Sequence, residues 1–200
     1  LALAHNGNLT NTGDLAEMVQ KLEGDSAKND RGATTDTEIM TALIGLQDEK
    51  NVEASAIAVL PKLEGAFSLV FMDEKTLYAA RDRHGVRPLV IGKLDRGWVV
   101  ASETAALDIV GAAFVREVEP GEFLAINEDG IRSQMWATPD PKGCIFEYVY
   151  LARPDTTIAG QGVHATRVRI GKRLAIEAPV EADLVIPVPE SGTPAAIGYA

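Results

Sequence analysis

The sequence predicts an α+β fold with antiparallel sheets and helices outside them, followed by the start of an α/β domain. Three helical patterns within residues 14–63 precede about seven short strand-like runs within residues 65–136. The hydrophobic period changes at Gly65 from helical to alternating. Two prolines and a glycine at 137–143 then separate these runs from a continuous apolar strand and a glycine turn, which are typical of a parallel sheet.

The chain is expected to open with a strand and then a helix. Residues 1–6 read as a strand that stops in a tight turn at Asn6-Gly7, a dipeptide that favours turns. Apolar residues with helical spacing predict a helix that ends at Gly24. They are Leu15, Met18, Val19 and Leu22. The polar residues 25–33 are expected to form a loop.

Two more helices are expected before the strands begin. Thr35 and Glu38 have the spacing of a capping box in front of an apolar helical pattern. Residues 52–63 read as a third helix, with Pro61 near its end. The strand-like runs follow, with one short helix at 103–111 among them. They lie at residues 65–73, 76–81, 87–94, 97–102, 113–119, 121–129 and 130–136.

The proline-containing segment 137–143 is the expected domain boundary. We therefore expect one domain over residues 1–138 and the start of a second over residues 144–200. In the second, residues 144–155 read as extended and residues 164–177 as a basic helix. The last stretch reads as a buried apolar strand over 183–188, a polar turn and a helix of small residues.

Composition narrows the functional classes. The hydrophobic content of 46% and charged content of 24% are ordinary for a soluble globular protein. A net charge of −10 argues against nucleic acid as a partner. No apolar stretch approaches the roughly 18 residues of a membrane span. The single cysteine, Cys144, allows no disulfide within the chain and fits a reducing, cytoplasmic compartment.

The motif His5-Asn6-Gly7-Asn8 has two interpretations. In the first it is only a hairpin turn, because Asn-Gly adopts positive φ cheaply. In the second, the Asn6 side-chain amide and the Gly7 N–H are two convergent donors for the oxygen of a tetrahedral acyl-transfer intermediate. The residues alone leave both interpretations open.

Asp36 likewise has a structural and a functional interpretation, and the two are compatible. It lies in the first turn of the helix that the Thr35 capping box predicts. The helix dipole favours a carboxylate there, and a carboxylate can bind a substrate ammonium group.

Three other candidates carry weaker signals. The segment Arg81–Arg87 is expected to be a solvated loop in which His84 is a surface histidine. Cys144 is a nucleophile, a metal or cluster ligand, or a packing residue, and a lone thiol most often packs. Glu190 and Ser191 follow the apolar strand at a usual ligand position and offer oxygens of the kind that magnesium accepts.

Together these motifs resemble a known family. AHNGNLTN, TDTE, GAFSLVFM, ARDRHGVRPLVIG and ASETAAL are similar to the class II glutamine amidotransferase domain of the N-terminal-nucleophile type. CIFEYVYLARPD and DLVIPVPESGTPAAIGYA resemble the join and the first part of the phosphoribosyltransferase domain in amidophosphoribosyltransferases. This resemblance implies stacked antiparallel sheets between helix layers, followed by the start of an α/β phosphoribosyltransferase domain.

The resemblance also implies a reaction. A cysteine thiolate at the protein's N-terminus hydrolyses glutamine, and the ammonia passes internally to a second site. There it displaces pyrophosphate from phosphoribosyl pyrophosphate and gives 5-phosphoribosylamine, the first committed step of purine synthesis. Purine nucleotides are the implied feedback inhibitors, and a homo-oligomer is implied, with no membrane or nucleic-acid partner.

Specific residues acquire roles from the same resemblance. Asn6 and Gly7 would form the oxyanion hole, and Asp36 would hold the α-ammonium of glutamine. Ser191 matches a position associated with Mg²⁺, and Cys144 matches one ligand of the [4Fe–4S] cluster that one branch of the family carries. Glu190 departs from the family pattern, where Asp is often found.

The resemblance further predicts that the chain is a fragment. The nucleophilic cysteine is expected upstream of Leu1 and the phosphate-binding loop beyond Ala200, so the fragment alone is expected to be inactive. The alternatives are another class II enzyme, such as glucosamine-6-phosphate synthase, and a non-catalytic regulatory homologue.

Overall fold

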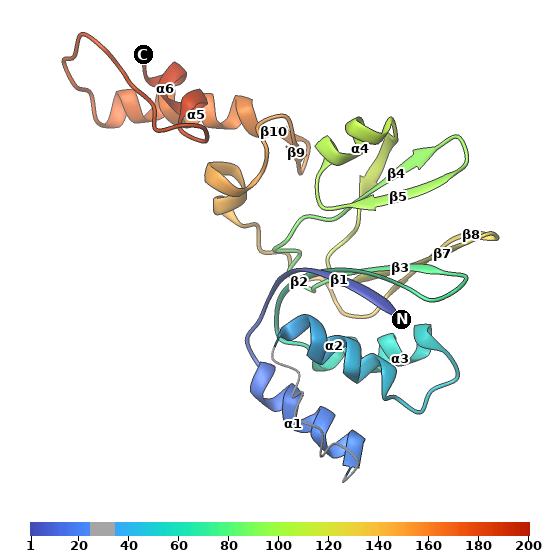
Figure 1. Ribbon diagram of the computed structural model, residues 1–200. Helices are drawn as coiled ribbons and strands as arrows, with labels where there is room; N and C mark the ends of the chain where they lie inside the picture. Colours follow the sequence, from blue (N-terminus) through green and yellow to red (C-terminus); the bar gives the residue numbers. More distant parts are fainter. Residues whose placement is uncertain (25–34) are drawn as a thin grey trace. The chain divides into compact units, whose positions relative to one another are not determined.

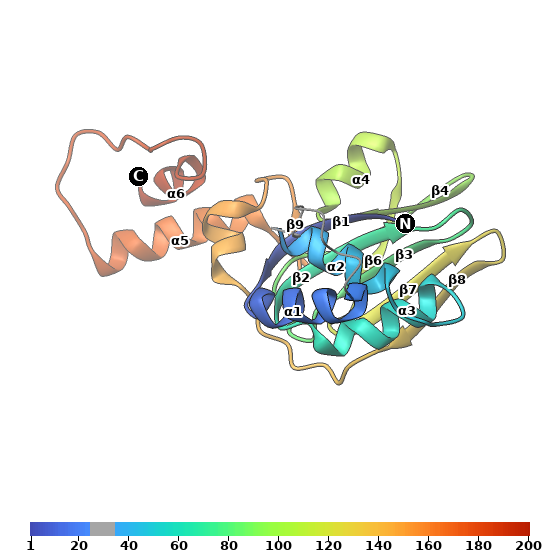
Figure 2. The same ribbon diagram turned by 60° about the horizontal axis from the view of Figure 1, so that its bottom comes forward.

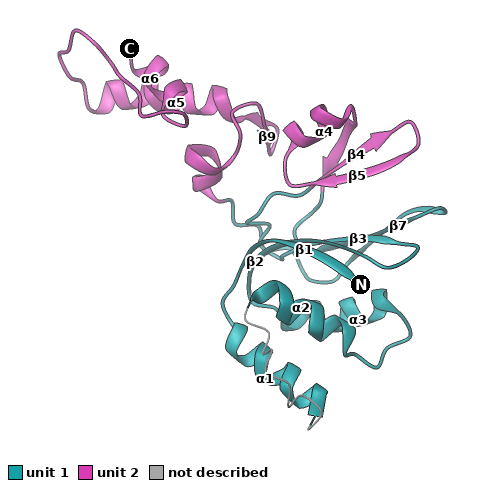
Figure 3. Cartoon of the chain, viewed as in Figure 1, with its two compact units in different colours: residues 1–89, 118–143 teal, residues 90–117, 144–200 magenta. Residues whose placement is uncertain are grey.

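The computed structural model describes residues 1–24 and 35–200, which form two compact units. Unit 1 consists of residues 1–89 and 118–143, and unit 2 consists of residues 90–117 and 144–200 (Figure 3). The loop expected at 25–33 lies outside the described residues. The assignment of residues 1–138 and 144–200 to two domains stays a prediction, because the units reflect only contacts within this chain.

Unit 1 is built on a five-stranded antiparallel sheet with strand order β1-β2-β3-β7-β8. Its strands are β1 (Ala2–Leu9), β2 (Gly65–Met72), β3 (Leu77–Arg81), β7 (Glu122–Asn127) and β8 (Gly130–Met135). Its helices are α1 (Thr12–Glu23), α2 (Asp36–Gly45) and α3 (Val52–Val59), the last continuing into a 3-10 turn (Leu60–Lys62). The three helices lie on one face of the sheet (Figures 1 and 2).

The core of unit 1 lies between the sheet and these helices. Leu69 and Phe71 of β2 are buried against Met40 and Leu43 of α2, and all four side chains are at most 1% exposed. The predicted capping box is confirmed: the Thr35 hydroxyl accepts the Glu38 N–H, and the Glu38 carboxylate accepts the Thr35 N–H. Local capping and the apolar pattern therefore fix where α2 begins and which face it buries.

Unit 2 contains a three-stranded antiparallel sheet with order β5-β4-β6. Its strands are β4 (Val90–Leu94), β5 (Gly97–Ala101) and β6 (Ala113–Glu117), and helix α4 (Thr104–Val110) connects two of them. Leu107 of α4 packs on Val90 in a small apolar cluster. A Cβ at Gly92 would lie 2.9 Å from the Leu107 side chain, so glycine is needed for this close approach.

The rest of unit 2 is helical. A π-helical turn (Glu147–Leu151) leads through two short paired strands to helices α5 and α6. These elements are β9 (Thr157–Ile158), β10 (Gln161–Gly162), α5 (Val163–Glu177) and α6 (Thr193–Tyr199). A Cβ at Gly171 would collide with the Ala195 carbonyl, and one at Gly198 with the Val168 carbonyl. The two helices therefore contact each other through their backbones.

Two predictions for this region were wrong. Residues 144–155 are not extended, because the buried Arg167 side chain donates to the Tyr148 and Ala152 carbonyls and closes a helical turn. The segment 183–188 forms no strand in the structure, and Leu184 is 71% exposed. A strand requires a hydrogen-bonding partner, and none of the described residues pairs with this segment.

The predicted turn at Asn6-Gly7 was also wrong. Strand β1 continues through both residues to Leu9, and Gly7 lies opposite Phe67 of β2. Gly7 adopts a φ of +147°, which glycine allows without ending the pairing. The α+β class with antiparallel sheets is confirmed by the observed sheets. Within residues 1–24 and 35–200, no helix has the length and apolar character to span a membrane.

Candidate active site

The Gly7 backbone lies on an edge strand, and the pairing pattern shows where its N–H points. Both backbone groups of Phe67, the residue opposite Gly7, bond to Asp82: the Phe67 N–H donates to the Asp82 carboxylate and the Phe67 carbonyl accepts the Asp82 N–H. Asp82 lies beyond β2 from β1. Opposite residues of an antiparallel ladder alternate between bonded and non-bonded pairs, and Gly7–Phe67 is therefore a non-bonded pair. Hence the Gly7 N–H points away from β2, off the edge of the sheet.

Glycine is required at position 7. A Cβ there would collide with the carbonyl oxygen of Ala66 on the neighbouring strand. It would also lie 2.9 Å from Nε2 of His5. The exposed Gly7 backbone is therefore open to a ligand because no side chain covers it.

The Asn6 side chain lies in a row that crosses three strands. Asn6 is opposite Ser68 of β2, and Ser68 is opposite Arg81 of β3, so all three side chains share one face of the sheet. Arg87 contacts this row. Its Nε donates to Oδ1 of Asn6 over 3.1 Å, and its carbonyl accepts the Ser68 hydroxyl at 3.1 Å.

The loop that carries Arg87 is tied to the sheet, which corrects the prediction of a solvated loop. Arg81 is 6% exposed, and Asp82 is 1% exposed. The Arg81 guanidinium donates to the carbonyls of Gly85, Arg87 and Val118. Buried charged groups persist only when hydrogen-bonded in this way, so the loop has a fixed conformation.

Asp36 lies beside the same edge of β1. Its Oδ2 accepts the Leu9 N–H at 3.3 Å, and its Oδ1 accepts the Thr37 N–H at 2.9 Å. Leu9 is two residues beyond Gly7, so the two N–H groups point to the same side of the strand. The carboxylate is 21% exposed, which leaves part of it accessible to a ligand.

His5 lies beside Asp36 on the helix-facing side of β1. Its Nδ1 lies 3.5 Å from Oδ2 of Asp36, and its side chain is only 2% exposed. In the described part of the chain, its buried Nε2 has no hydrogen-bond partner. The structure thus places the Gly7 N–H and the Asp36 carboxylate along the same edge of β1, with His5 beside Asp36 and Arg87 beside Asn6. That these residues form one site stays a prediction.

This arrangement can bind a small molecule with a carbonyl oxygen and an ammonium group. The Gly7 N–H points off the edge, the neighbouring Asn6 amide is held by Arg87, and Asp36 supplies a negative charge two residues along. Sequence reasoning missed His5 and Arg87. Their positions within the motifs HNG and RHGVRPL were visible, but their contacts depend on strand pairing.

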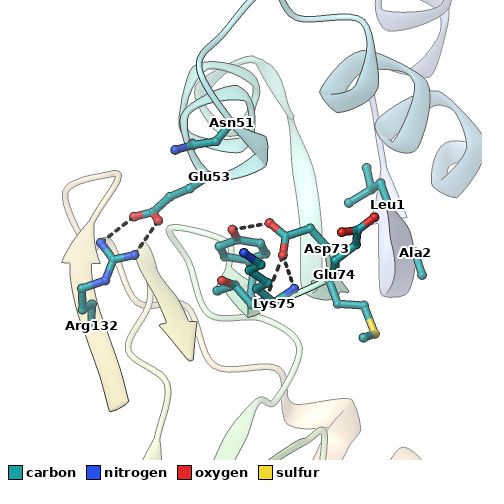
Figure 4. Close-up of a pocket in the computed structure, with 11 residues that line it drawn as sticks. Leu1, Ala2, Asn51, Glu53, Asp73, Glu74, Lys75 and Arg132 are labelled. Carbon is teal, nitrogen blue, oxygen red and sulfur yellow. Dashed lines mark hydrogen bonds and ion pairs between the residues drawn. The ribbon is translucent and has the colours of Figure 1, made fainter. Parts of the chain in front are cut away.

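A cavity of about 830 Å³ in unit 1 lies elsewhere, near Leu1 and the turn after β2. None of the predicted site residues lines it. Figure 4 shows Glu53 paired with Arg132 at one side and Asp73 at the other. The backbone N–H of Lys75 bonds to Asp73 and lowers the pKa of this carboxyl. These charged groups are satisfied within the protein, so the cavity gives no support to the site.

The predicted metal ligands are not gathered into a site. Cys144 is half-buried, and Ser191 is partly exposed in the loop before α6. Among residues 1–24 and 35–200, no three His, Cys, Asp or Glu side chains are placed to hold a metal ion.

Comparison with known proteins shows which proteins the whole chain is similar to. Over the whole length of this chain, it is 62% identical to the amidophosphoribosyltransferase of Mycobacterium leprae. It is 41% identical to the glutamine phosphoribosylpyrophosphate amidotransferase of B. subtilis, solved with ADP and GMP, with a TM-score of 0.90 over 99% of the chain. A second solved structure, described as the allosteric regulatory enzyme of purine biosynthesis, is 41% identical with a TM-score of 0.91 over 99% of the chain.

These relatives are much longer proteins. The chain spans 36% of the M. leprae relative, 43% of the B. subtilis chain and 42% of the second solved chain. The structural matches confirm the predicted fold class over nearly all of this chain. A family model described as a glutamine amidotransferase domain matches residues 1–109, more than half of the 200 residues. The chain therefore belongs to the glutamine amidotransferase domain family.

Proposed function

We propose that the chain is part of an amidophosphoribosyltransferase that uses glutamine as its nitrogen donor. In this reaction glutamine is hydrolysed to glutamate and ammonia, and the ammonia displaces pyrophosphate from phosphoribosyl pyrophosphate to give 5-phosphoribosylamine. Membership of the glutamine amidotransferase family supports the first half. Relatives that carry this enzyme's name and match the whole chain support the second half.

The observation that carries the proposal is the geometry at the edge of β1. During acyl transfer the glutamine side-chain carbonyl becomes a tetrahedral oxyanion, which needs donors that are already in place. The Gly7 N–H points off the strand edge, and the Asn6 amide is next to it on one face. We assign these two groups to the oxyanion hole. The attacking thiolate is not among the residues of this chain.

Asp36 would bind the α-ammonium group of glutamine. Backbone N–H groups of Leu9 and Thr37 already hold its two oxygens at 3.3 Å and 2.9 Å, so the carboxylate is oriented before the substrate arrives. Its position in the first turn of α2 places it near the positive end of the helix dipole. The charge of the carboxylate would select an amino acid over a simple amide.

The remaining assignments concern the complete protein. Ser191 would supply an oxygen for Mg²⁺ beside the sugar diphosphate, and Cys144 would supply one of about four thiolates for a [4Fe–4S] cluster. In both cases the other ligands would have to come from outside this chain. Feedback inhibition by purine nucleotides, a homo-oligomer and a cytoplasmic location belong to the same proposal.

The test is the substitution Asn6→Ala in the complete protein that carries this chain. Loss of one oxyanion donor should lower glutamine-dependent turnover by roughly 10²–10³-fold. Turnover with added ammonia should stay within about twofold, because that route bypasses acyl transfer. Asn8→Ala is the matched control, since it removes an amide two positions along the same face of β1.

The two activities separate the possible outcomes. A selective loss of glutamine-dependent turnover supports the proposal. An equal loss of both activities would show that Asn6 serves the structure rather than glutamine chemistry. Glutamine-dependent turnover that survives in Asn6→Ala would rule out its place in the oxyanion hole.

A further inference from the structure

The contact between Arg87 and Asn6 determines which way the Asn6 amide faces. A guanidinium carries only donors, so the group it contacts must be an acceptor. Nε of Arg87 lies 3.1 Å from Oδ1 of Asn6, and the amide must therefore present its oxygen to Arg87. The planar amide carries its NH₂ group on the other branch, which then faces away from Arg87.

The orientation matters because an amide has two opposite ends. Rotation by 180° about the terminal bond would exchange the NH₂ donor for a carbonyl oxygen. An oxygen directed at a developing oxyanion would repel it, whereas an NH₂ group stabilises it. A partner that holds the amide in one orientation therefore preserves its function as a donor.

The backbone of Arg87 is held in place by two hydrogen bonds to its carbonyl oxygen. Its carbonyl accepts the Ser68 hydroxyl at 3.1 Å and Nε of Arg81 at 2.9 Å. Ser68 is the residue opposite Asn6, so the anchor and the target of Arg87 are neighbours on adjacent strands. The side chain therefore reaches Asn6 from a fixed point.

The loop between β3 and Arg87 is shaped for this contact. The second guanidinium branch of Arg81 donates to the Gly85 carbonyl at 2.9 Å. Gly85 has a φ of +60°, and a Cβ there would lie 2.7 Å from the Pro120 side chain. This close packing and the positive φ both favour glycine at this turn of the loop.

We propose that Arg87 is a positioning residue for the oxyanion hole: its guanidinium fixes the Asn6 amide with the NH₂ group toward the glutamine carbonyl. This inference rests on the proposed function of Asn6. The charge of Arg87 also strengthens the bond, since a charged donor makes about twice as strong a hydrogen bond as a neutral one. Arg87 acts through Asn6 and makes no contact with the substrate.

The test is a double-mutant cycle in the complete protein with Arg87→Ala, Asn6→Ala and the double variant. Arg87→Ala should lower kcat with glutamine by about tenfold or more. This loss is smaller than the roughly 10²–10³-fold loss expected when the oxyanion donor itself is removed. The KM for glutamine and the ammonia-dependent turnover should stay within about twofold. In the Asn6→Ala background, Arg87→Ala should have no further effect, because the group it orients is gone.

Two further variants act as controls. Arg83→Ala removes an exposed guanidinium from the same loop and should leave both activities unchanged. Arg87→Lys restores a donor and the charge without the planar fork, so it should recover part of the lost kcat.

The outcomes distinguish the role of Arg87 from that of Asn6. Losses that multiply in the double variant, or a parallel loss of ammonia-dependent turnover in Arg87→Ala, would overturn the positioning role while leaving the role of Asn6 intact. An Asn6→Ala variant with full glutamine-dependent turnover would overturn both. Non-additive losses confined to the glutamine reaction support both.

Discussion

The segments at residues 2–9 and 183–188 were both expected to contain a strand that ends at a polar, glycine-containing turn, but they differ in structure. The first segment forms β1, with all eight residues in register with β2. The second segment forms no strand, although its sequence is the more continuously apolar of the two. Leu9 is 4% exposed at the end of β1, whereas Leu184 is 71% exposed.

The difference shows that an apolar pattern specifies a strand only where a partner is available. Strand β1 pairs with β2 on one side, and helix α2 contributes to the apolar core that buries Leu9, so the backbone groups that face β2 have partners. For 183–188, the described residues offer neither a paired strand nor a covering layer.

The largest effect is expected from truncating one leucine in each segment. Leu9→Ala should lower the free energy of unfolding by roughly 2–5 kcal/mol, because a buried leucine leaves a cavity. Leu184→Ala should change it by less than about 0.5 kcal/mol, since the side chain is already in water. Denaturant unfolding of the two variants measures the difference. Equal losses would show that 183–188 is buried in solution, against the structure.

A smaller effect is expected from adding a methyl group to β1. An alanine at position 7 would have to adopt a φ of +147°, and its Cβ would collide with the Ala66 carbonyl. Gly7→Ala should therefore lower the free energy of unfolding by on the order of 1–3 kcal/mol. Gly13→Ala in α1 is the matched control, because a Cβ there meets nothing within 4 Å. We expect it to be neutral or stabilising by up to about 1 kcal/mol. Thermal unfolding gives both values, and a Gly7→Ala variant as stable as the Gly13→Ala variant would contradict the observed backbone.

The smallest effect is a pH dependence at the turn that follows β2. Hydrogen bonds from Lys75, Tyr78 and Thr76 lower the pKa of Asp73 in the folded protein. The stabilisation is therefore present above the ordinary aspartate pKa of about 3.9 and is lost as the pH falls through the lower folded value.

Asp73→Asn removes this titration. The stability difference between the wild type and Asp73→Asn should be constant near neutral pH and should shrink below about pH 4. Glu74→Gln, an exposed neighbour, serves as the control in urea unfolding at several pH values. A difference that grows as the pH falls would show that the carboxylate is not stabilised in the folded state.

Much of the candidate site was visible in the sequence. The residues allow a pair of donors at Asn6 and Gly7 and a carboxylate at a helix start, and the family resemblance assigns these three residues to a glutamine site. The structure places all three at one edge of the sheet. Their assumed setting was wrong, however, since Asn6 and Gly7 lie within a strand and not in a turn.

The contribution of Arg87 could not have been predicted from its neighbours in the sequence. Its loop contains five charged or titratable residues within seven positions, a composition that usually indicates a solvated surface. Only the pairing of β1, β2 and β3 places Asn6, Ser68 and Arg81 in one row beneath it. Buried hydrogen bonds from Arg81 and Ser68 then hold this polar loop against the sheet.

The sequence by itself determined the α+β class, the capping box of α2 and the succession of helices and strands along residues 1–136. These features depend on apolar periodicity and on hydrogen bonds between residues three or four positions apart. Only the tertiary structure decided the direction of the Gly7 N–H, the bond between Arg87 and Asn6 across 81 positions, and the exposure of 183–188. Each of these depends on which distant segment supplies a partner, and the local sequence does not contain that information.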